Sequence, residues 1–540
     1  MESADRTGLT PDEFAEAVRS LSTPDIVPSP FGDLTFFDGV PLAETVTTAY
    51  DALDLMRGVE VFLNAVPGAS LVAFRNGLRQ AGITSPRTIG ITDPRGNSGG
   101  LYLTPNTETT YGSTMLDLKA WGPTVIEAPP ESLCVVDDFW FRYVADMGIA
   151  GPDRGAGGKY LFLPPGYDGD IPDGYFVYRT PTYTNFVVLR ALGGVPAMRT
   201  TKSFSCGASA SASGYTFVVL RALGGVPAMR TTKVYPLAEA EAPQENDFVV
   251  RIAGTPPSAR STTKVYPLAE AEAPQENDFV NLAEVAVNTV HANDFSFFEE
   301  VAALVTEEPV AALDAERAGQ LAAIGIVSGQ PFAPDERMRD ILGRAALIGA
   351  GIARVLAYAP RDPDTVLYGS WKNAFAGGSY EFLRNGARLL DARTQFHYIA
   401  TVITPAMAHA QVGAGSAYAY TVHDANGDLL DGGRTYRLHV DPNPPAKNFW
   451  AVDVYDTQTR SLLVVPSTIH PAVASNDDRV EANEDGSYDL YFGPVAPDGK
   501  ESNWVETVPG KSWFQLFRLY GPLQPWFDQT WKLNEFERID

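Results

Sequence analysis

The sequence predicts an α+β protein with two antiparallel β-sandwich (jelly-roll-like) domains and with N-terminal and central helices packed between them. The chain has 540 residues, whereas a single hydrophobic core stops growing at about 250–300 residues, so we expect more than one domain. Apolar residues recur at helical spacing in two regions, and short apolar runs separated by Gly, Pro and Asp fill two others. The composition, 45% apolar and 20% charged, is that of a folded globular protein.

The helical regions are the N-terminus and the middle of the chain. Apolar residues keep helical spacing from Leu42 to about Gly82, and Pro67 interrupts the run. We expect two helices there, within an N-terminal helical segment of residues 1–85. Helical spacing returns in residues 281–410, which we interpret as a helical middle layer.

The β regions follow each helical region. Residues 86–280 contain short apolar runs such as YLFL and GYFVYR between Gly, Pro and Asp clusters, and they predict a first β domain. Residues 411–540 alternate apolar and polar side chains around turn signals such as Asn426-Gly427 and Asp485-Gly486. They predict a C-terminal β-sandwich domain.

Two segments of the first β domain are duplicated without a substitution. FVVLRALGGVPAMRTTK occurs at 186–202 and 217–233, and TTKVYPLAEAEAPQENDFV occurs at 231–249 and 262–280. A solenoid would need three or more similar copies of one unit, so these are not solenoid repeats. Perfect identity indicates a recent duplication or an error in the gene model. We expect residues 203–264 to be an insertion, and either copy fits the native strands.

Charge, cysteines and termini limit the function classes. The 41 basic and 66 acidic side chains give a net charge of −25, which repels nucleic acid. Two cysteines cannot form a disulfide framework, and no zinc motif occurs, so we expect no metal site; the sequence leaves any cofactor unassigned. The most apolar segment, 345–359, is too short for a membrane span and contains Arg354. The polar N-terminus predicts a cytoplasmic protein without a signal peptide.

A first candidate site lies in TPNTETTYGSTMLDL. Asn106, Thr109 and Tyr111 place hydrogen-bonding groups directly before and within a predicted strand. We interpret them as candidate ligand-binding residues.

A second candidate site lies in SYEFLRNGARLLDARTQFHY, which we expect to be helical. Tyr380, Asp391, Arg393 and His397 would give this helix both charge signs beside apolar faces. Buried charges need partners, so the segment predicts either interdomain salt bridges or a polar pocket. Trp450 in NFWAVDVYD completes the candidate ligand-binding set, and no residue is assigned a catalytic role.

Several segments together resemble a known pair of bacterial domains. They include TPNTETTYGSTMLDLKAWGPTVIEAP, GGKYLFLPPGYDGDIPDGYFVYRTPTY, GGSYEFLRNGARLLDARTQF, NFWAVDVYDTQTRS and ESNWVETVPGKSWFQLFRLYGPLQPWF. The N-terminal half resembles domain of unknown function 1254, and the C-terminal half resembles domain of unknown function 1214. The resemblance implies two β-sandwich or jelly-roll-like domains with helices around and between them. Many relatives look exported, and the family supplies no catalytic residues.

Two functions remain open. The first is a soluble small-molecule-binding protein or hydrolase with a polar pocket between the helical layer and the β domains, in which Asp or His would activate water and Tyr or Arg would stabilise negative charge. The alternative is a non-catalytic β-sandwich assembly or interaction protein. Its surface would be built from aromatic residues such as Trp504, Trp513, Trp526 and Trp531. We expect a homo-oligomer.

Overall fold

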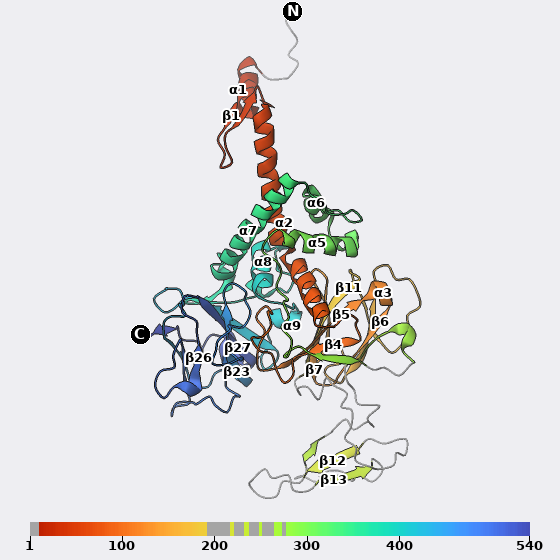
Figure 1. Ribbon diagram of the computed structural model, residues 1–540, viewed down its shortest axis with the longest axis vertical. Helices are drawn as coiled ribbons and strands as arrows, with labels where there is room; N and C mark the ends of the chain where they lie inside the picture. Colours follow the sequence, from red (N-terminus) through yellow and green to blue (C-terminus); the bar gives the residue numbers. More distant parts are fainter. Residues whose placement is uncertain (1–9, 192–215, 221–231, 237–247, 251–263, 273–276) are drawn as a thin grey trace, which may run out of the picture.

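The computed structural model describes residues 10–191, 216–220, 232–236, 248–250, 264–272 and 277–540. These residues form a mixed α+β structure with several open sheets and with helices in the N-terminal and middle parts of the chain (Figure 1). The predicted α+β class is confirmed at this level.

The first β region contains two sheets. A six-stranded sheet has the order β16-β4-β5-β11-β7-β8, and a four-stranded sheet has the order β10-β9-β6-β15. Side chains of both sheets, among them Val136, Phe162 and Val187, form one hydrophobic core. The strands are β4 (Thr88–Ile91), β5 (Thr110–Asp117), β6 (Thr124–Ala128), β7 (Ser132–Asp138), β8 (Tyr143–Gly148), β9 (Gly158–Leu163), β10 (Phe176–Arg179), β11 (Thr184–Ala191), β15 (Lys264–Pro267) and β16 (Asp278–Asn281).

The C-terminal β region repeats this plan. A six-stranded sheet, β17-β18-β21-β27-β23-β24, shares a core with a four-stranded sheet, β26-β25-β22-β28. Trp513 and Trp531 lie in this core. The strands are β17 (Val366–Tyr368), β18 (Trp371–Lys372), β21 (Ser416–Thr421), β22 (Tyr436–Val440), β23 (Ala446–Asp456), β24 (Ala472–Ala474), β25 (Tyr488–Gly493), β26 (Trp504–Glu506), β27 (Trp513–Pro522) and β28 (Glu537–Arg538).

The sequence led us to expect purely antiparallel sheets, but the strand pairing in the structure is mixed. Most neighbouring strands are antiparallel, but the pairs β9–β10, β4–β16 and β25–β26 run parallel. Each of these pairs joins an edge strand to its sheet after an intervening loop or a longer connection. Such connections allow the chain to return in the same direction, which a tight hairpin does not.

The helices form a layer that both β regions share (Figure 1). Residues of α2, α5 and α7 pack on the first six-stranded sheet, and residues of α7 and α8 pack on the second. The helices are α1 (Pro11–Leu21), α2 (Ala43–Gln80), α3 (Leu118–Trp121), α5 (Ser296–Glu307), α6 (Ala315–Ala323), α7 (Glu336–Tyr358), α8 (Leu390–Ile399), α9 (Pro405–Ala408) and α10 (Gln524–Phe527).

Helix α2 is continuous through Pro67, so the expected break into two helices is wrong. Proline has no N–H to donate to the carbonyl four residues earlier, which is that of Leu63. The Thr394 hydroxyl of α8 donates to this carbonyl at 3.0 Å and replaces the missing bond. The kink-prone position is therefore stabilised by a tertiary contact that helical spacing alone does not show.

The segment 380–399 is not one helix, contrary to our expectation. Leu383–Arg384 and Ala387–Arg388 form a small hairpin, β19–β20, and α8 begins only at Leu390. Asn385 and Gly386 both have positive φ angles, 53° and 79°. An Asn-Gly pair of this kind forms the tight two-residue turn of a hairpin, and the turn ends the helical run.

The structure places the two copies of each repeat differently. The first copy of FVVL lies in β11 and pairs with β5 and β7, and the second copy of KVYP lies in β15 and pairs with β6. The other copies lie in β12 (Thr216–Leu220) and β13 (Thr232–Pro236), which pair with each other and with β14 (Phe248–Val250). The strands of the two main sheets thus lie outside the predicted insertion 203–264, apart from Lys264 at its end.

Two helices, α2 and α7, are long and apolar enough to cross a membrane by length and composition alone. In the most apolar stretch, 61% of α2 and 50% of α7 is buried inside the structure. Core helices of soluble proteins meet the same criterion, so this is weak evidence for a membrane span.

The duplicated strands offer a matched test of the fold. Phe186 is 1% exposed and packs on Phe74 with ring centroids 4.5 Å apart, and Phe217 is its copy in β12. We expect Phe186→Ala to lower the free energy of unfolding by about 3–5 kcal/mol, and Phe217→Ala, whose strand lies outside the main sheet, to lower it by less. Urea unfolding followed by circular dichroism measures both. Equal losses in the two variants would contradict the assignment of β11 to the main sheet.

Candidate functional site

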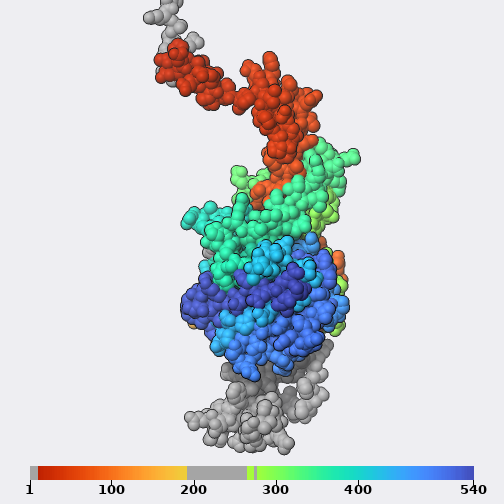
Figure 2. Space-filling model, turned by 90° about the vertical axis from the view of Figure 1, so that its left-hand side faces the viewer, coloured from red at the N-terminus to blue at the C-terminus, as the bar shows by residue number. Residues whose placement is uncertain are grey.

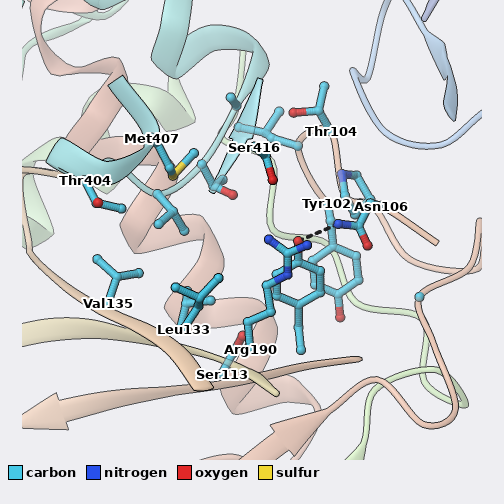
Figure 3. A pocket seen from close by; sticks show the side chains of 18 of the residues that line it. Tyr102, Thr104, Asn106, Ser113, Leu133, Val135, Arg190, Thr404, Met407 and Ser416 are labelled. Carbon is cyan, nitrogen blue, oxygen red and sulfur yellow. Dashed lines mark hydrogen bonds between the residues drawn. The ribbon is translucent and has the colours of Figure 1, made fainter. Parts of the chain in front are cut away.

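A cavity of about 230 Å³ lies between the two six-stranded sheets. Its walls come from β5, β7 and β11 of the first sheet, from β21 and β27 of the second, and from α2, α8 and α9. Figure 3 shows Arg190, Tyr102 and Asn106 on one side of the cavity and Thr404 and Met407 on the other. Most of the wall is apolar, so its few polar groups decide what the cavity can bind.

Strand alternation places the side chains of the first wall. In the register of β5 and β11, Tyr111 lies opposite Arg190 and Ser113 lies opposite Val188. Successive side chains of a strand point to opposite faces of the sheet. These four residues therefore line the cavity, whereas the neighbouring Leu189 lies in the core that the first region's two sheets share.

Arg190 is a cation of this wall that has no charged partner among the described residues. Its guanidinium lies 5.1 Å from the ring centroid of Tyr520 and 5.9 Å from that of Tyr111, distances at which an aromatic ring attracts a cation. In the described part of the chain, no carboxylate is within ion-pair distance of Arg190, and its buried Nε has no hydrogen-bond partner. The positive charge of Arg190 is therefore available to a ligand.

Arg518 contributes a second guanidinium from the opposite sheet. It is 6% exposed, and one terminal nitrogen donates to the Thr104 carbonyl at 2.9 Å and to the Tyr455 hydroxyl at 2.6 Å. Its Nε is 3.2 Å from Oδ2 of Asp453. A buried charge needs such partners. The guanidinium of Arg518 is therefore already stabilised by groups of the protein itself.

Two carboxyl groups, those of Asp453 and Glu108, belong to this cluster. Asp453 is fully buried, and burial followed by the negative charge of Glu108 raises its pKa well above the ordinary value, while Arg518 lowers it. The Tyr520 hydroxyl donates to Glu108 at 3.1 Å. Burial thus disfavours the charged form of Asp453, whereas its contact with Arg518 favours that form.

The loop of residues 104–108 belongs to the first β region and forms hydrogen bonds to the second. The Thr107 N–H donates to Oδ1 of Asp453 at 3.2 Å, and the Tyr455 hydroxyl donates to the Pro105 carbonyl at 2.6 Å. The loop thus forms part of the cavity wall and satisfies buried polar groups of the second sheet.

A carboxyl with a raised pKa lies on the Thr404 side of the cavity. Asp146, from β8, is 7% exposed and accepts a hydrogen bond from the Thr404 hydroxyl at 3.1 Å. Burial raises the pKa of Asp146 to about 6, although the hydrogen bond from Thr404 opposes the shift. This carboxyl changes charge near neutral pH.

Asn106 and Tyr111, two of the predicted site residues, line this cavity. The Asn106 amide nitrogen donates to the Tyr111 hydroxyl oxygen at 2.7 Å, drawn as the dashed line in Figure 3. Thr109, also predicted, donates to Oδ1 of Asn106 from its N–H at 3.1 Å and from its hydroxyl at 2.9 Å. Thr109 therefore orients Asn106 from behind the wall.

Tyr380 and Asp391 do not line the cavity. The Tyr380 ring meets the Tyr143 ring edge to face, with centroids 5.4 Å apart. Asp391 is exposed and forms an ion pair with Arg361 at 3.0 Å. The structure does not bring these two predicted residues together with Asn106.

Arg393 and His397 belong to α8 and are buried away from the cavity. Arg393 and Arg317 both donate to Oδ1 of Asn64, and burial followed by the charges of neighbouring arginines lowers the pKa of Arg393 to about 9. His397 stacks on Phe141 with ring centroids 5.2 Å apart, and burial lowers its pKa to about 3. A neutral, packed imidazole at this position stabilises the core.

Trp450 points into the C-terminal core. It is 3% exposed and stacks on Phe517 with ring centroids 5.8 Å apart. Trp450 and Asp453 lie an odd number of positions apart on β23, so they face opposite sides of the sheet. Asp453 and Tyr455 therefore share the other side of β23, where they meet the loop of residues 104–108.

Arg190, Arg518 and Asp146 line the cavity but were not among the site residues predicted from the sequence. Arg518 is the cation in the otherwise uncharged strand WFQLFRLYGP, and Arg190 follows the apolar run FVVL. A charge within a strand that is buried on both faces needs a partner or a ligand, and this signal was available. No comparable local signal marked Asp146.

Within the described ranges, no group of three or more His, Cys, Asp or Glu residues is placed to hold a metal ion. The charged residues that line the cavity are Arg190, Arg518 and Asp146, and hydroxyl groups lie beside them.

Two family descriptions match the chain in the order that the resemblance predicted. The family described as protein of unknown function DUF1254 matches residues 88–204, and the family described as protein of unknown function DUF1214 matches residues 415–524. The first match lies in the first β region, and the second lies in the C-terminal β region. The DUF1254 domain supplies Tyr111 and Arg190, and the DUF1214 domain supplies Ser416 and Arg518, so the cavity lies between them.

Two solved structures are similar to the chain over most of its length. The VPA0106 protein of Vibrio parahaemolyticus is 14% identical, with a TM-score of 0.47, over 90% of this chain and 99% of that one. A putative uncharacterized protein from Burkholderia cenocepacia is 10% identical, with a TM-score of 0.35, over 92% of this chain and 97% of that one. No curated protein matches.

The raised pKa of Asp146 predicts a measurable pH dependence of stability. The folded state keeps the proton on Asp146 up to about pH 6, whereas the ordinary pKa is 3.8. The folded state is therefore favoured below about pH 4, and this contribution is lost as the pH rises through 6. Asp146→Asn stays neutral throughout, so we expect its free energy of unfolding to exceed that of the wild type by about 3 kcal/mol at pH 7.5 and to match it near pH 4.

Urea unfolding at several pH values between 4 and 8 measures this difference. Asp168→Asn, at an exposed position outside the cavity, is the matched control and should leave the pH profile unchanged. A constant difference between Asp146→Asn and the wild type at all pH values would contradict the shifted pKa.

Proposed function

We propose that the protein binds a small amphipathic anion, such as an apolar molecule with one carboxylate, in the cavity between the DUF1254 and DUF1214 domains. The single observation that carries the proposal is Arg190, a partly buried cation on the cavity wall with no carboxylate partner among the described residues. Removing a charge from water without compensation is costly, and a bound anion would supply the compensation.

A second guanidinium supports an anion at this position. Arg518 lines the cavity beside Tyr418 and raises the local positive potential, although its own hydrogen bonds are already formed. Tyr102 also lines the wall, and its buried hydroxyl has no hydrogen-bond partner. An anion beside Arg190 could accept a hydrogen bond from this hydroxyl, which would satisfy both groups.

The rest of the cavity favours an apolar body. It is lined by Phe74 of α2, Val188 of β11, Phe396 of α8 and Met407 of α9. Burying apolar ligand surface against such side chains contributes roughly 25 cal/mol per Å². The anion would therefore set the orientation of the ligand, and the apolar wall would supply much of the affinity.

Hydrolysis of an ester of such an anion is the second candidate function, and it rests on Asp146. With a pKa of about 6, this carboxyl is ionised at neutral pH and can take a proton from water. No histidine is among the described residues that line the cavity. Turnover of p-nitrophenyl esters by the wild type but not by Asp146→Asn would support this function.

We also propose that each pair of sheets is a β-sandwich with jelly-roll-like connections. The support is that the six-stranded and four-stranded sheets of each region contribute to one hydrophobic core. The assembly alternative gains no support from the tryptophans, because Trp513 and Trp531 are buried and Trp504 and Trp526 are partly buried.

The binding proposal is tested with two fluorescent probes of similar shape. 1-Anilinonaphthalene-8-sulfonate carries a negative charge, and N-phenyl-1-naphthylamine does not. We expect Arg190→Met to weaken binding of the sulfonate about tenfold or more, since a charge-assisted contact contributes roughly 1.5–3 kcal/mol. The neutral probe should bind both proteins equally, because methionine preserves the apolar stem.

Fluorescence titration gives both dissociation constants. Arg434→Met, at an exposed arginine outside the cavity, is the control and should bind both probes as the wild type does. If Arg190→Met binds the sulfonate as tightly as the wild type, the anion does not sit at Arg190 and the proposal fails.

A further inference from the structure

The N-terminal part of the structure extends away from both β regions. We call residues 10–50 the arm; it comprises α1, the small sheet β1 (Ile26–Val27), β2 (Leu34–Phe37) and β3 (Val40–Pro41), and the beginning of α2. Figures 1 and 2 show the arm projecting beyond the helical layer. Thr45 is its one buried residue, and the Thr45 hydroxyl bonds to Thr35 within the arm itself.

The arm exposes many large apolar side chains. Leu21 is 83% exposed and Phe37 is 76% exposed. Single exposed apolar residues are ordinary, but a concentration of them marks an interaction surface. The exposed set in the arm is Phe14, Val18, Leu21, Ile26, Phe31, Phe37, Val40, Leu42, Val46 and Tyr50.

The arm is also strongly acidic. Its basic residue is Arg19, and no ion pair joins any arm residue to another described residue. Its acidic residues are Asp12, Glu13, Glu16, Asp25, Asp33, Asp38 and Glu44. A partner surface for the arm would therefore be apolar and basic.

Helix α7 carries a surface of that kind. Leu347, Ile348, Ile352 and Val355 are exposed, and their spacing places them along one side of the helix; we call them the α7 stripe. Arg344 is exposed one turn before Ile348, and it forms no ion pair in the described part of the chain. Figure 2 shows α7 crossing the face of the molecule with no other segment over it.

The arm cannot reach the α7 stripe of its own chain in this fold. Helix α2 runs without a break from Ala43 to Gln80 and fixes the direction of the arm. Its buried part packs on α7, where Gly58 lies against Ala345 and Gly349 lies against Phe62. The two helices are therefore held together while the arm points away (Figure 1).

We propose that the arm packs on the α7 stripe of a second copy of this chain, and that two copies exchange arms in a symmetric dimer. Apolar side chains meet apolar side chains, and the acidic arm meets Arg344. In a two-fold dimer each arm finds the same surface on its partner, so both contacts form at once. An anionic lipid surface fits less well, because the acidic arm would be repelled.

Two variants separate the two halves of the contact. The arm variant is Val18→Glu with Phe37→Glu, and the stripe variant is Leu347→Glu with Val355→Glu; all four positions are exposed, so the fold should tolerate them. Light scattering should give about twice the chain mass of 58.3 kDa for the wild type and 58.3 kDa for each variant. Burying a charge in the apolar contact should raise the dissociation constant roughly 100-fold.

A mixture of the two variants makes the test specific. The intact arm of the stripe variant can bind the intact stripe of the arm variant, so the mixture should regain a dimer through one of the two contacts. Val464→Glu with Val495→Glu, at exposed positions on the C-terminal β region, is the control and should remain dimeric.

Three results would overturn the proposal. A wild type that is monomeric at tens of micromolar would do so, as would variants that remain dimeric. A mixture of variants that stays monomeric would show that like surfaces pair, arm with arm or stripe with stripe. Sedimentation of a monomeric wild type with phosphatidylcholine–phosphatidylglycerol vesicles would assign the arm to a lipid surface instead.

Discussion

The buried contact between Arg518 and Asp453 is the interaction on which the arrangement of the two β regions depends. Both groups are buried on the side of the DUF1214 sheet that faces the DUF1254 domain, and buried charges cost several kcal/mol unless they are paired and hydrogen-bonded. The missing partners come from the other domain, through the Thr104 carbonyl and the Thr107 N–H. Each domain therefore satisfies polar groups of the other, and the cavity is the space that remains beside this contact.

The cavity and the arm lie in different parts of the molecule, so ligand binding and assembly can coexist. The cavity is bounded by the two six-stranded sheets and by helix residues such as Phe74. The arm projects from the other side of the helical layer (Figure 1). A dimer formed through α7 would leave Arg190 accessible, because Arg190 lies on the sheet and not on the helix.

The repeats show how far tertiary contacts override local sequence. The FVVL of β11 lies between β5 and β7 in the main sheet, and the identical FVVL of β12 pairs with β13 and β14. Local preference for a strand is the same in both copies, so each forms one. The partners differ because pairing depends on which strands are already near in space.

The sequence by itself determined the α+β class, the order of helical and β regions and the resemblance to two families, and it singled out Asn106 and Tyr111, which line the cavity. These follow from local periodicity and from short motifs. It did not determine that α2 continues through Pro67, that Trp450 faces the core, or that Arg190 and Arg518 share one cavity. Those outcomes depend on contacts between residues far apart in the chain, such as Thr394 with Leu63. Only the folded structure decides which distant groups satisfy each other's charges and hydrogen bonds.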